Sequence, residues 1–533
     1  MYTKIDKNSE KGGIFTGMIG GALSLTVSAV VVKIIGLIYK IPISSILGDE
    51  GMGYFNSAYT VYAFFYLLCT AGVPKAVMIL LSEAKAKGRK PEEAEILRVS
   101  LRLFTLIGLL GTVLLLLFSG PISLLIANRG AFFTMISIAP SIVLVSVAGV
   151  IRGYLSANTR LLDIAISQVI EGVGKLAVGL VLAMVGRWLG VNLQMLSAIT
   201  IFGVTFGSFF GLLYLLVISK IKITSQKTEQ NAEDLNAKLI RKRIFTISIP
   251  ITLSAAVMSL TSIIDLGIVM RSLLNSGVDE AGASALYGNY TTLAVPMFNL
   301  AISVISPISV AFLPVFTSRI AKGDQVGLIE AERSALELTA AISAPMMIGL
   351  AVYSEEILSM LFLNSEIEVG AILLRLISPA ILLSSILLIV NTLLEAAGRV
   401  RAPLISMTVG SVVKIAVSYY LIGFTDMGVA GAPIGTVMSY AAALITSLLI
   451  YGSCFGRGAP IFACILIPHI NALTAVAISV VCFMGLSASF SKNLSLLLSI
   501  ALAALVYLAI SIFTGTLGIE KMGKMAKYTN FSQ

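Results

Sequence analysis

The sequence has little charge, one histidine and one tryptophan. Charged residues make up 12% of its 533 residues, whereas soluble domains carry about 25%, so an ordinary soluble domain is excluded. A single histidine leaves almost no material for a zinc site or for histidine-based catalysis. The four cysteines lie within or beside apolar runs and form no close CxxC pair, so we expect neither disulfides nor a metal site: Cys69, Cys454, Cys464 and Cys482.

Motifs of bond-making chemistry are missing as well. The chain has no phosphate-binding loop, no HExxH, no nucleophile elbow and no pair of carboxylates at catalytic spacing. We therefore expect a protein that is not an enzyme and holds no cofactor. Energy for transport would come from a gradient (H⁺ or Na⁺), the membrane potential or substrate turnover elsewhere. Basic residues do not cluster with aromatic ones as a nucleic-acid surface requires, so no nucleic-acid partner is expected.

Long apolar runs are abundant. Hydrophobic residues make up 57% of the chain, and a transmembrane helix needs about 20 of them in succession. This criterion predicts an all-α polytopic membrane protein with about fourteen transmembrane helices. The polar start MYTKIDKNSEK and the length of the first apolar run predict a span that is retained rather than a cleaved signal peptide.

The distribution of Lys and Arg predicts the orientation. With both termini in the cytoplasm, most basic residues fall in inner loops, as the positive-inside rule requires. The segment 220–243 alone contains seven. The outer loops contain only Arg129, Arg187, Arg271 and Lys492. We predict a multi-pass protein of a bacterial cytoplasmic membrane.

The chain also repeats itself weakly. Residues 156–178 align without gaps to 395–417, so that Lys175 matches Lys414, and Asn56 matches Asn289 around an earlier pair of spans. Because six spans separate the copies, the repeat is parallel, and substrate is expected between the halves. We predict an N-lobe (1–219), a basic cytoplasmic linker (220–243), a C-lobe (244–455), two further helices (456–518) and a cytoplasmic tail (519–533).

Basic residues inside apolar runs are the candidate binding groups. An ammonium in hydrocarbon costs roughly 2.5–3.5 kcal/mol, so it normally faces a wet or protein-lined interior. Lys33 and Lys40 are seven residues apart, on nearly one helical face. Snorkelling to the headgroups is the alternative for Lys33 and the better explanation for Lys40. The full candidate set is Lys33, Lys40, Lys75, Lys175, Arg375 and Lys414.

Two acids and two prolines complete the candidates. Glu171, four residues before Lys175, either neutralises it or leaves it for the substrate. Asp265 either takes up a coupling H⁺ or Na⁺ or balances one of the lysines. Pro74 and Pro307 are candidate hinges, or ordinary kinks. Finally, the first hairpin is expected to break at Pro42 and turn through residues 48–51.

Three segments carry a family resemblance: GLIYKIPISSILGDEGMG, TAGVPKAVMILLSEAKAKG and RGYLSANTRLLDIAISQVIEGVGK. They resemble the stage V sporulation protein B family of the multidrug/oligosaccharidyl-lipid/polysaccharide (MOP) exporter superfamily, which is related to MurJ-type lipid II flippases. The resemblance implies a MATE/MOP-like fold, with two lobes around a central cavity, alternating access and a polyprenyl-pyrophosphate-linked sugar as cargo. MurJ-type proteins use first-helix arginines for the pyrophosphate. Here Lys33 matches one, without the bidentate fork of arginine, and Tyr39 or Lys40 matches the second.

These observations predict a flippase for a lipid II-like peptidoglycan precursor or another lipid-linked oligosaccharide. Its role in the vegetative wall, spore cortex or capsule is left open, as is its oligomeric state, with a monomer possible. The main alternative is a cation-coupled multidrug or small-solute exporter of the same fold, which would need acids in its cavity. A membrane glycan polymerase would need a large outer loop, and every predicted outer loop is short. A non-transporting scaffold is a further alternative.

Overall fold

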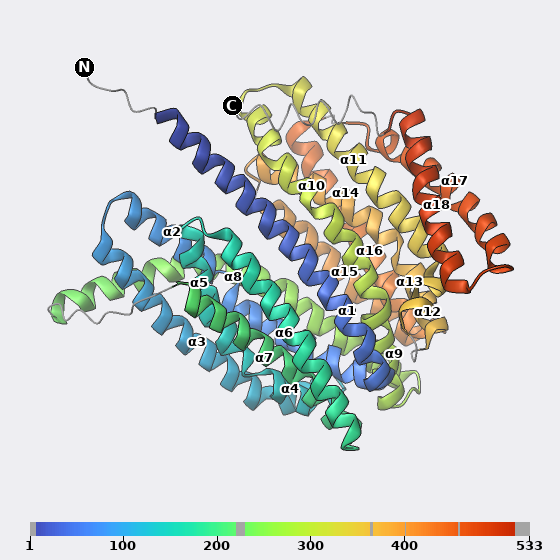
Figure 1. Cartoon of the computed structure of the whole chain (residues 1–533), viewed down its shortest axis with the longest axis horizontal. Helices are drawn as coiled ribbons and strands as arrows, with labels where there is room; N and C mark the ends of the chain where they lie inside the picture. Colours follow the sequence, from blue (N-terminus) through green and yellow to red (C-terminus); the bar gives the residue numbers. More distant parts are fainter. Residues whose placement is uncertain (1–6, 220–229, 363–365, 400, 457–458, 517–533) are drawn as a thin grey trace. The chain divides into compact units, whose positions relative to one another are not determined.

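The structure is a computed structural model that describes residues 7–219, 230–362, 366–399, 401–456 and 459–516. Within these ranges every regular element is helical (Figure 1). The chain falls into two compact units, Met1–Gly267 and Ile268–Gln533, called unit 1 and unit 2 below. The predicted lobe boundaries stay a prediction. The predicted tail and residues 220–229 of the predicted linker lie outside the described residues.

Unit 1 contains the first eight elements and the larger part of the ninth, α8. Its core lies where α2, α3 and α5 pack together, with Ile240 and Ile244 of α8 covering them. The helix α8 continues into unit 2. The elements are α1 (Lys7–Thr70), α2 (Val73–Ala86), α3 (Lys90–Leu125), η1 (Arg129–Ala131), α4 (Phe132–Ile138), α5 (Ser141–Ala157), α6 (Leu161–Trp188), α7 (Leu193–Ser219) and α8 (Gln230–Asn275).

Unit 2 contains the remaining described elements, the last two of which are α17 and α18. The terminal pair α17 and α18 pack on one another, and α17 also packs on α11 (Figure 1). The elements are α9 (Glu280–Asn289), η2 (Tyr290–Ala294), α10 (Val295–Ala321), α11 (Gln325–Val352), α12 (Ser354–Leu361), α13 (Ile367–Ile377), α14 (Pro379–Ala396), α15 (Ala402–Phe424), η3 (Gly428–Ala430), α16 (Gly431–Phe455), α17 (Ile461–Ser487) and α18 (Lys492–Phe513).

The number of spans is confirmed only in part. The described residues contain 11 helices long and apolar enough to cross a membrane, or up to 12 if Arg129–Ile138 and Ser141–Ala157 form one broken span. The chain is therefore a multi-pass membrane protein. One of the 11, Val31–Ala86, has 56 residues, and a single span needs only about 20. The predicted total of fourteen stays a prediction.

The first hairpin turns at Gly48 and not at Pro42, which lies inside α1. Gly48 has φ 65° and ψ −179°, a conformation that favours glycine because a Cβ would be strained there. Just before this turn, the Arg187 guanidinium of α6 donates to the carbonyl oxygens of Ser45 and Ile46, at 3.1 and 3.3 Å. This contact ties the end of α6 to this arm of α1.

The helix that follows the first turn is interrupted next to Pro74. The helix α1 ends at Thr70 and α2 begins at Val73, with Pro74 in its first turn. At the break, the Gly72 N–H donates to Thr252 Oγ1 of α8 at 3.2 Å. A Cβ on Gly72 would collide with the Ser248 carbonyl oxygen, so the glycine lets α8 approach closely.

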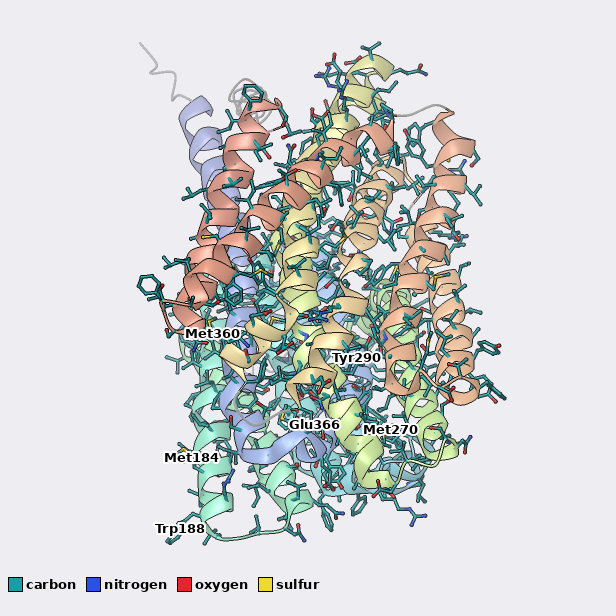
Figure 2. All side chains as sticks on the ribbon, turned by 90° about the vertical axis from the view of Figure 1, so that its right-hand side faces the viewer. Met184, Trp188, Met270, Tyr290, Met360 and Glu366 are labelled. Atoms are coloured by element: carbon teal, nitrogen blue, oxygen red, sulfur yellow. The ribbon has the colours of Figure 1, made fainter. Side chains whose placement is uncertain are left out.

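The helical segment from Glu280 to Ala321 contains a π-helix that the sequence did not signal. The elements α9, η2 and α10 follow without interruption, and η2 is the π-helical segment. Its first residue, Tyr290, is 4% exposed and lies among the helices in Figure 2. The Tyr290 and Thr436 hydroxyls hydrogen bond at 3.0 Å, which ties η2 to α16. Pro307 lies inside α10, which continues through it.

Two helix pairs, α6 with α7 and α15 with α16, pack in the same way. A Cβ on Gly203 of α7 would lie 3.0 Å from the Lys175 carbonyl oxygen, and one on Gly435 of α16 would lie 3.2 Å from that of Lys414. Glycines allow this backbone-to-backbone approach. The recurring contact places Lys175 and Lys414 at matching positions of their helix pairs.

Candidate substrate-binding site

Five residues of unit 1 form what we call the basic–aromatic cluster: Tyr39, Lys40, Asn56, Tyr59 and Lys175. Four come from α1, because the turn at Gly48 brings its two arms together. The Lys40 ammonium donates to Asn56 Oδ1 at 3.1 Å. The Lys175 Nζ of α6 lies 4.7 Å from the ring centre of Tyr59 and 5.1 Å from that of Tyr39. These are cation–π distances.

Close packing of α1 on α6 fixes the cluster. Tyr39 is 2% exposed, and a Cβ on Gly179 would lie 2.5 Å from its hydroxyl oxygen. That hydroxyl donates to the Thr200 carbonyl oxygen of α7 at 3.4 Å. Tyr59 is 39% exposed. Lys175 is therefore held between one rigid buried ring and one ring at the edge of the cluster.

Beside the cluster, Glu171 forms an ion pair with Arg152. The Arg152 Nη2 of α5 lies 2.8 Å from Glu171 Oε2, and the two side chains are 12% and 28% exposed. Ser208 of α7 donates to the other carboxylate oxygen at 3.4 Å. Arg152 Nε also donates to Ser167, at 3.4 Å. Glu171 therefore does not form the self-neutralising pair with Lys175 that was one of the two alternatives.

The balance of charge around the cluster is positive. Lys40 and Lys175 provide two cations, and the Glu171 carboxylate beside them is paired with Arg152. The two lysine ammonium groups are close enough for their charges to repel. A ring face attracts an ammonium but carries no net charge to neutralise it. This arrangement suits an anion.

The structure places the other predicted basic residues of unit 1 outside the cluster. Lys33 and Lys75 are both exposed, on α1 and α2. Lys33 precedes Lys40 by seven residues, which is about 10 Å along a helix. A substrate role for either residue stays a prediction.

In unit 2 the predicted residues lie on different helices. Lys414 of α15 is half-buried and acts electrostatically on Tyr440 of α16. The Tyr440 ring centre is 5.6 Å from that of Phe298, so this lysine also has an aromatic neighbour. Arg375 of α13 is exposed and its Nε donates to Ser354 Oγ at 2.8 Å. Their roles in binding stay predictions.

Asp265 and the two prolines lie in different local environments, and their roles stay predictions. Asp265 is 6% exposed in α8. Pro74 follows a break and Pro307 lies within a continuous helix, so the two candidate hinges are not equivalent in local structure.

Sequence reasoning missed the tyrosines of the cluster and the partner of Glu171. Tyrosines are common in apolar runs, and nothing in the spacing of Tyr39 and Tyr59 predicts that their rings meet over one lysine. Arg152 precedes Glu171 by 19 residues and lies on another helix. A weak signal was available, since Arg152 ends one apolar run and Glu171 lies within the next.

The comparisons with known proteins identify the family. The model of the polysaccharide biosynthesis protein family matches residues 19–320, and the MatE model matches residues 250–420. The first match covers more than half of the chain, so the chain belongs to the polysaccharide biosynthesis protein family, within the MOP superfamily.

Individual relatives agree with this assignment. Stage V sporulation protein B of Bacillus subtilis (strain 168) is 23% identical over 420 residues, which are 78% of this chain and 80% of the relative. Lipid II flippase MurJ of the same organism is 20% identical over 449 residues, 80% of this chain and 81% of the relative. A solved structure of lipid II flippase MurJ in an inward closed conformation has a TM-score of 0.69 at 17% identity, covering 92% of this chain and 98% of the other. The likeness shows that the fold is shared.

Proposed function

We propose that the protein is a flippase that moves a polyprenyl-pyrophosphate-linked glycan across the cytoplasmic membrane by alternating access. The observation that carries the proposal is the positive basic–aromatic cluster, in which Lys175 faces two rings while Glu171 pairs with Arg152. A pyrophosphate is an anion with many acceptor oxygens, which suit lysine ammonium donors. The relative MurJ is named a lipid II flippase, which supports the same cargo class.

The surroundings of the cluster explain why lysines are suitable anion-binding groups at this site. An ammonium over an aromatic ring keeps its charge in a medium of low dielectric constant, because the ring face lowers the penalty of removing it from water. It can then exchange the ring for a phosphate oxygen without first breaking an ion pair. A lipid tail would stay in the bilayer while the headgroup crosses.

The test measures lipid II in the outer leaflet of cells depleted of their own flippase. Wild type is compared with Lys33→Ala and Lys175→Ala at matched membrane abundance. We expect wild type to restore outward lipid II, and Lys175→Ala to lower it at least tenfold. A wild-type protein that is well inserted and moves no lipid II would overturn lipid II as the cargo.

The second candidate is a cation-coupled multidrug exporter, favoured by the MatE match over residues 250–420. A cationic drug requires acidic partners, and in the described part of unit 1 the Glu171 carboxylate is already paired with Arg152. Drug-resistance assays in the same cells distinguish the two: protection from cationic drugs that survives Lys175→Ala would favour the exporter.

A further inference from the structure

Glu171 is the acid nearest to Lys175 along the chain, yet its carboxylate and the Lys175 ammonium contact different partners. Glu171 lies one helical turn before Lys175 on α6, at the spacing that favours a Glu–Lys pair. The charge of Glu171 already acts on Lys175. Nevertheless the carboxylate is directed to Arg152 and Ser208, and the ammonium to the rings of α1.

We propose that Arg152 is a positioning residue that holds the Glu171 carboxylate away from Lys175, so that the ammonium stays available to an anionic lipid headgroup. Arg152 binds Glu171 by a charge-assisted hydrogen bond at 2.8 Å, and its Nε is itself held by Ser167. Without the guanidinium, a mostly buried carboxylate would need another cation, and Lys175 is the nearest along its helix. The inference rests on the proposed function for its consequence in transport.

The internal repeat provides an independent comparison. The ungapped alignment that matches Lys175 to Lys414 places Gly410 opposite Glu171, and its extension by four residues places Asn391 opposite Arg152. Unit 2 therefore keeps the lysine but has neither the acid nor the arginine. Glu171 and Arg152 are thus both present in one copy of the repeat and both missing at the matching positions of the other. This is expected if the function of Arg152 is to pair with Glu171.

Close packing explains why Glu171 cannot simply turn away without Arg152. A Cβ on Gly207 would lie 2.5 Å from the Glu171 carbonyl oxygen, and one on Gly211 would lie 3.1 Å from the Glu171 Cβ. The backbone at Glu171 is thus pressed against α7, and its side chain has few directions to take. Arg152 pairs with it on one side, and Lys175 lies one turn further along the helix.

The experiment compares Arg152→Gln, Glu171→Gln, the double variant and Arg152→Lys. Arg333→Gln is the matched control, because Arg333 and Glu337 form an ion pair of the same 2.8 Å length in unit 2. One readout is acylation of the Lys175 amine in purified protein, measured by mass spectrometry. The second is outward lipid II at matched membrane abundance.

We expect Arg152→Gln to lower acylation of Lys175 severalfold and to reduce lipid II exposure, because Glu171 then pairs with the ammonium. The double variant and Arg152→Lys should stay near wild type in both readouts, and Glu171→Gln should stay near wild type in acylation of Lys175. Because the double variant leaves no unpaired charge, it folds even if Arg152→Gln is poorly inserted. A double variant as impaired as Arg152→Gln, or unchanged acylation in Arg152→Gln, would overturn the inference. If even wild type moves no lipid II, the proposed function fails, while the acylation series still decides the role of Arg152.

Discussion

At the scale of single residues, the lysines of the basic–aromatic cluster contact neutral groups, which stabilise an ammonium without neutralising its charge. Asn56 accepts from Lys40, and tyrosine rings face Lys175. Neutral partners of this kind stabilise an ammonium in an apolar medium and leave its charge available. The Glu171 carboxylate lies beside the cluster, and the Arg152 guanidinium pairs with it.

Tyr59 is expected to contribute through its ring. Tyr59→Leu removes one cation–π contact, worth about 0.5–1 kcal/mol at an exposed site, and should weaken binding of farnesyl pyrophosphate about two- to fivefold. Tyr59→Phe keeps the ring face and is the matched control. Equilibrium binding to purified protein is the measurement. Equal losses in both variants would show that the hydroxyl, and not the ring, is the important group.

Asp324, in the turn between α10 and α11, predicts a pH dependence. Its carboxylate accepts from the Gly327 N–H at 2.9 Å and pairs with Arg319, and these contacts lower its pKa. A lowered pKa means that the stabilisation is present above the unfolded-state pKa, about 3.9, and is lost as pH falls through the folded-state value. In detergent, the melting temperature of Asp324→Ala should be below that of wild type at pH 7, with the gap closing near pH 3. A gap that is independent of pH would contradict this.

At the scale of elements, α6 and α7 of unit 1 pack backbone to backbone. Glycines on both helices allow their backbones to touch: a Cβ on Gly203 would lie 2.5 Å from the Cα of Gly179. Because α6 carries both Lys175 and Glu171, this contact fixes the height and rotation of both side chains. The glycines of this contact therefore help to set the positions of Lys175 and Glu171.

Gly207→Ala tests this dependence. The added Cβ would lie 2.5 Å from the Glu171 carbonyl oxygen, and overpacking of this kind costs about 1–3 kcal/mol. We expect a lower melting temperature and weaker pyrophosphate binding. Gly349→Ala in α11 is the control, because nothing lies within 4 Å of its Cβ, and it should melt at or above the wild-type temperature. Unchanged binding in Gly207→Ala would show that α6 can shift without moving Lys175.

The sequence predicted the helical class, the matched lysines and the turn region of the first hairpin. These follow from hydropathy, from internal repetition and from glycine, which are local or periodic signals. It did not predict that α1 continues through Pro42, because a proline is compatible with a membrane helix when neighbours satisfy the freed carbonyl. Nor did it predict the Arg152–Glu171 pair or the rings over Lys175, because contacts between distant helices depend on helix rotation, which a single sequence does not fix.

At the scale of the whole molecule, the orientation predicted from Lys and Arg is directly testable. Trp188 ends α6 with 84% of its surface exposed, one turn after Met184, and projects from the helix end in Figure 2. Tryptophan favours the membrane–water interface. With the four native cysteines replaced, a cysteine at Asn192 should react with an impermeant maleimide in intact cells. One at Lys322 should react only after permeabilisation, and the reverse result would invert the predicted topology.

The glycine contact between α6 and α7 has a practical consequence for studying motion in this protein. Two helices whose backbones touch have no room to slide, so they should behave as one rigid rod during the transport cycle. A pair of spectroscopic labels, one on each of these helices, would report a constant separation and serve as an internal ruler. Distances from these two labels to a third label on α1 would then measure how the first helix moves. The fixed separation of the first two labels provides a reference that does not change during the cycle.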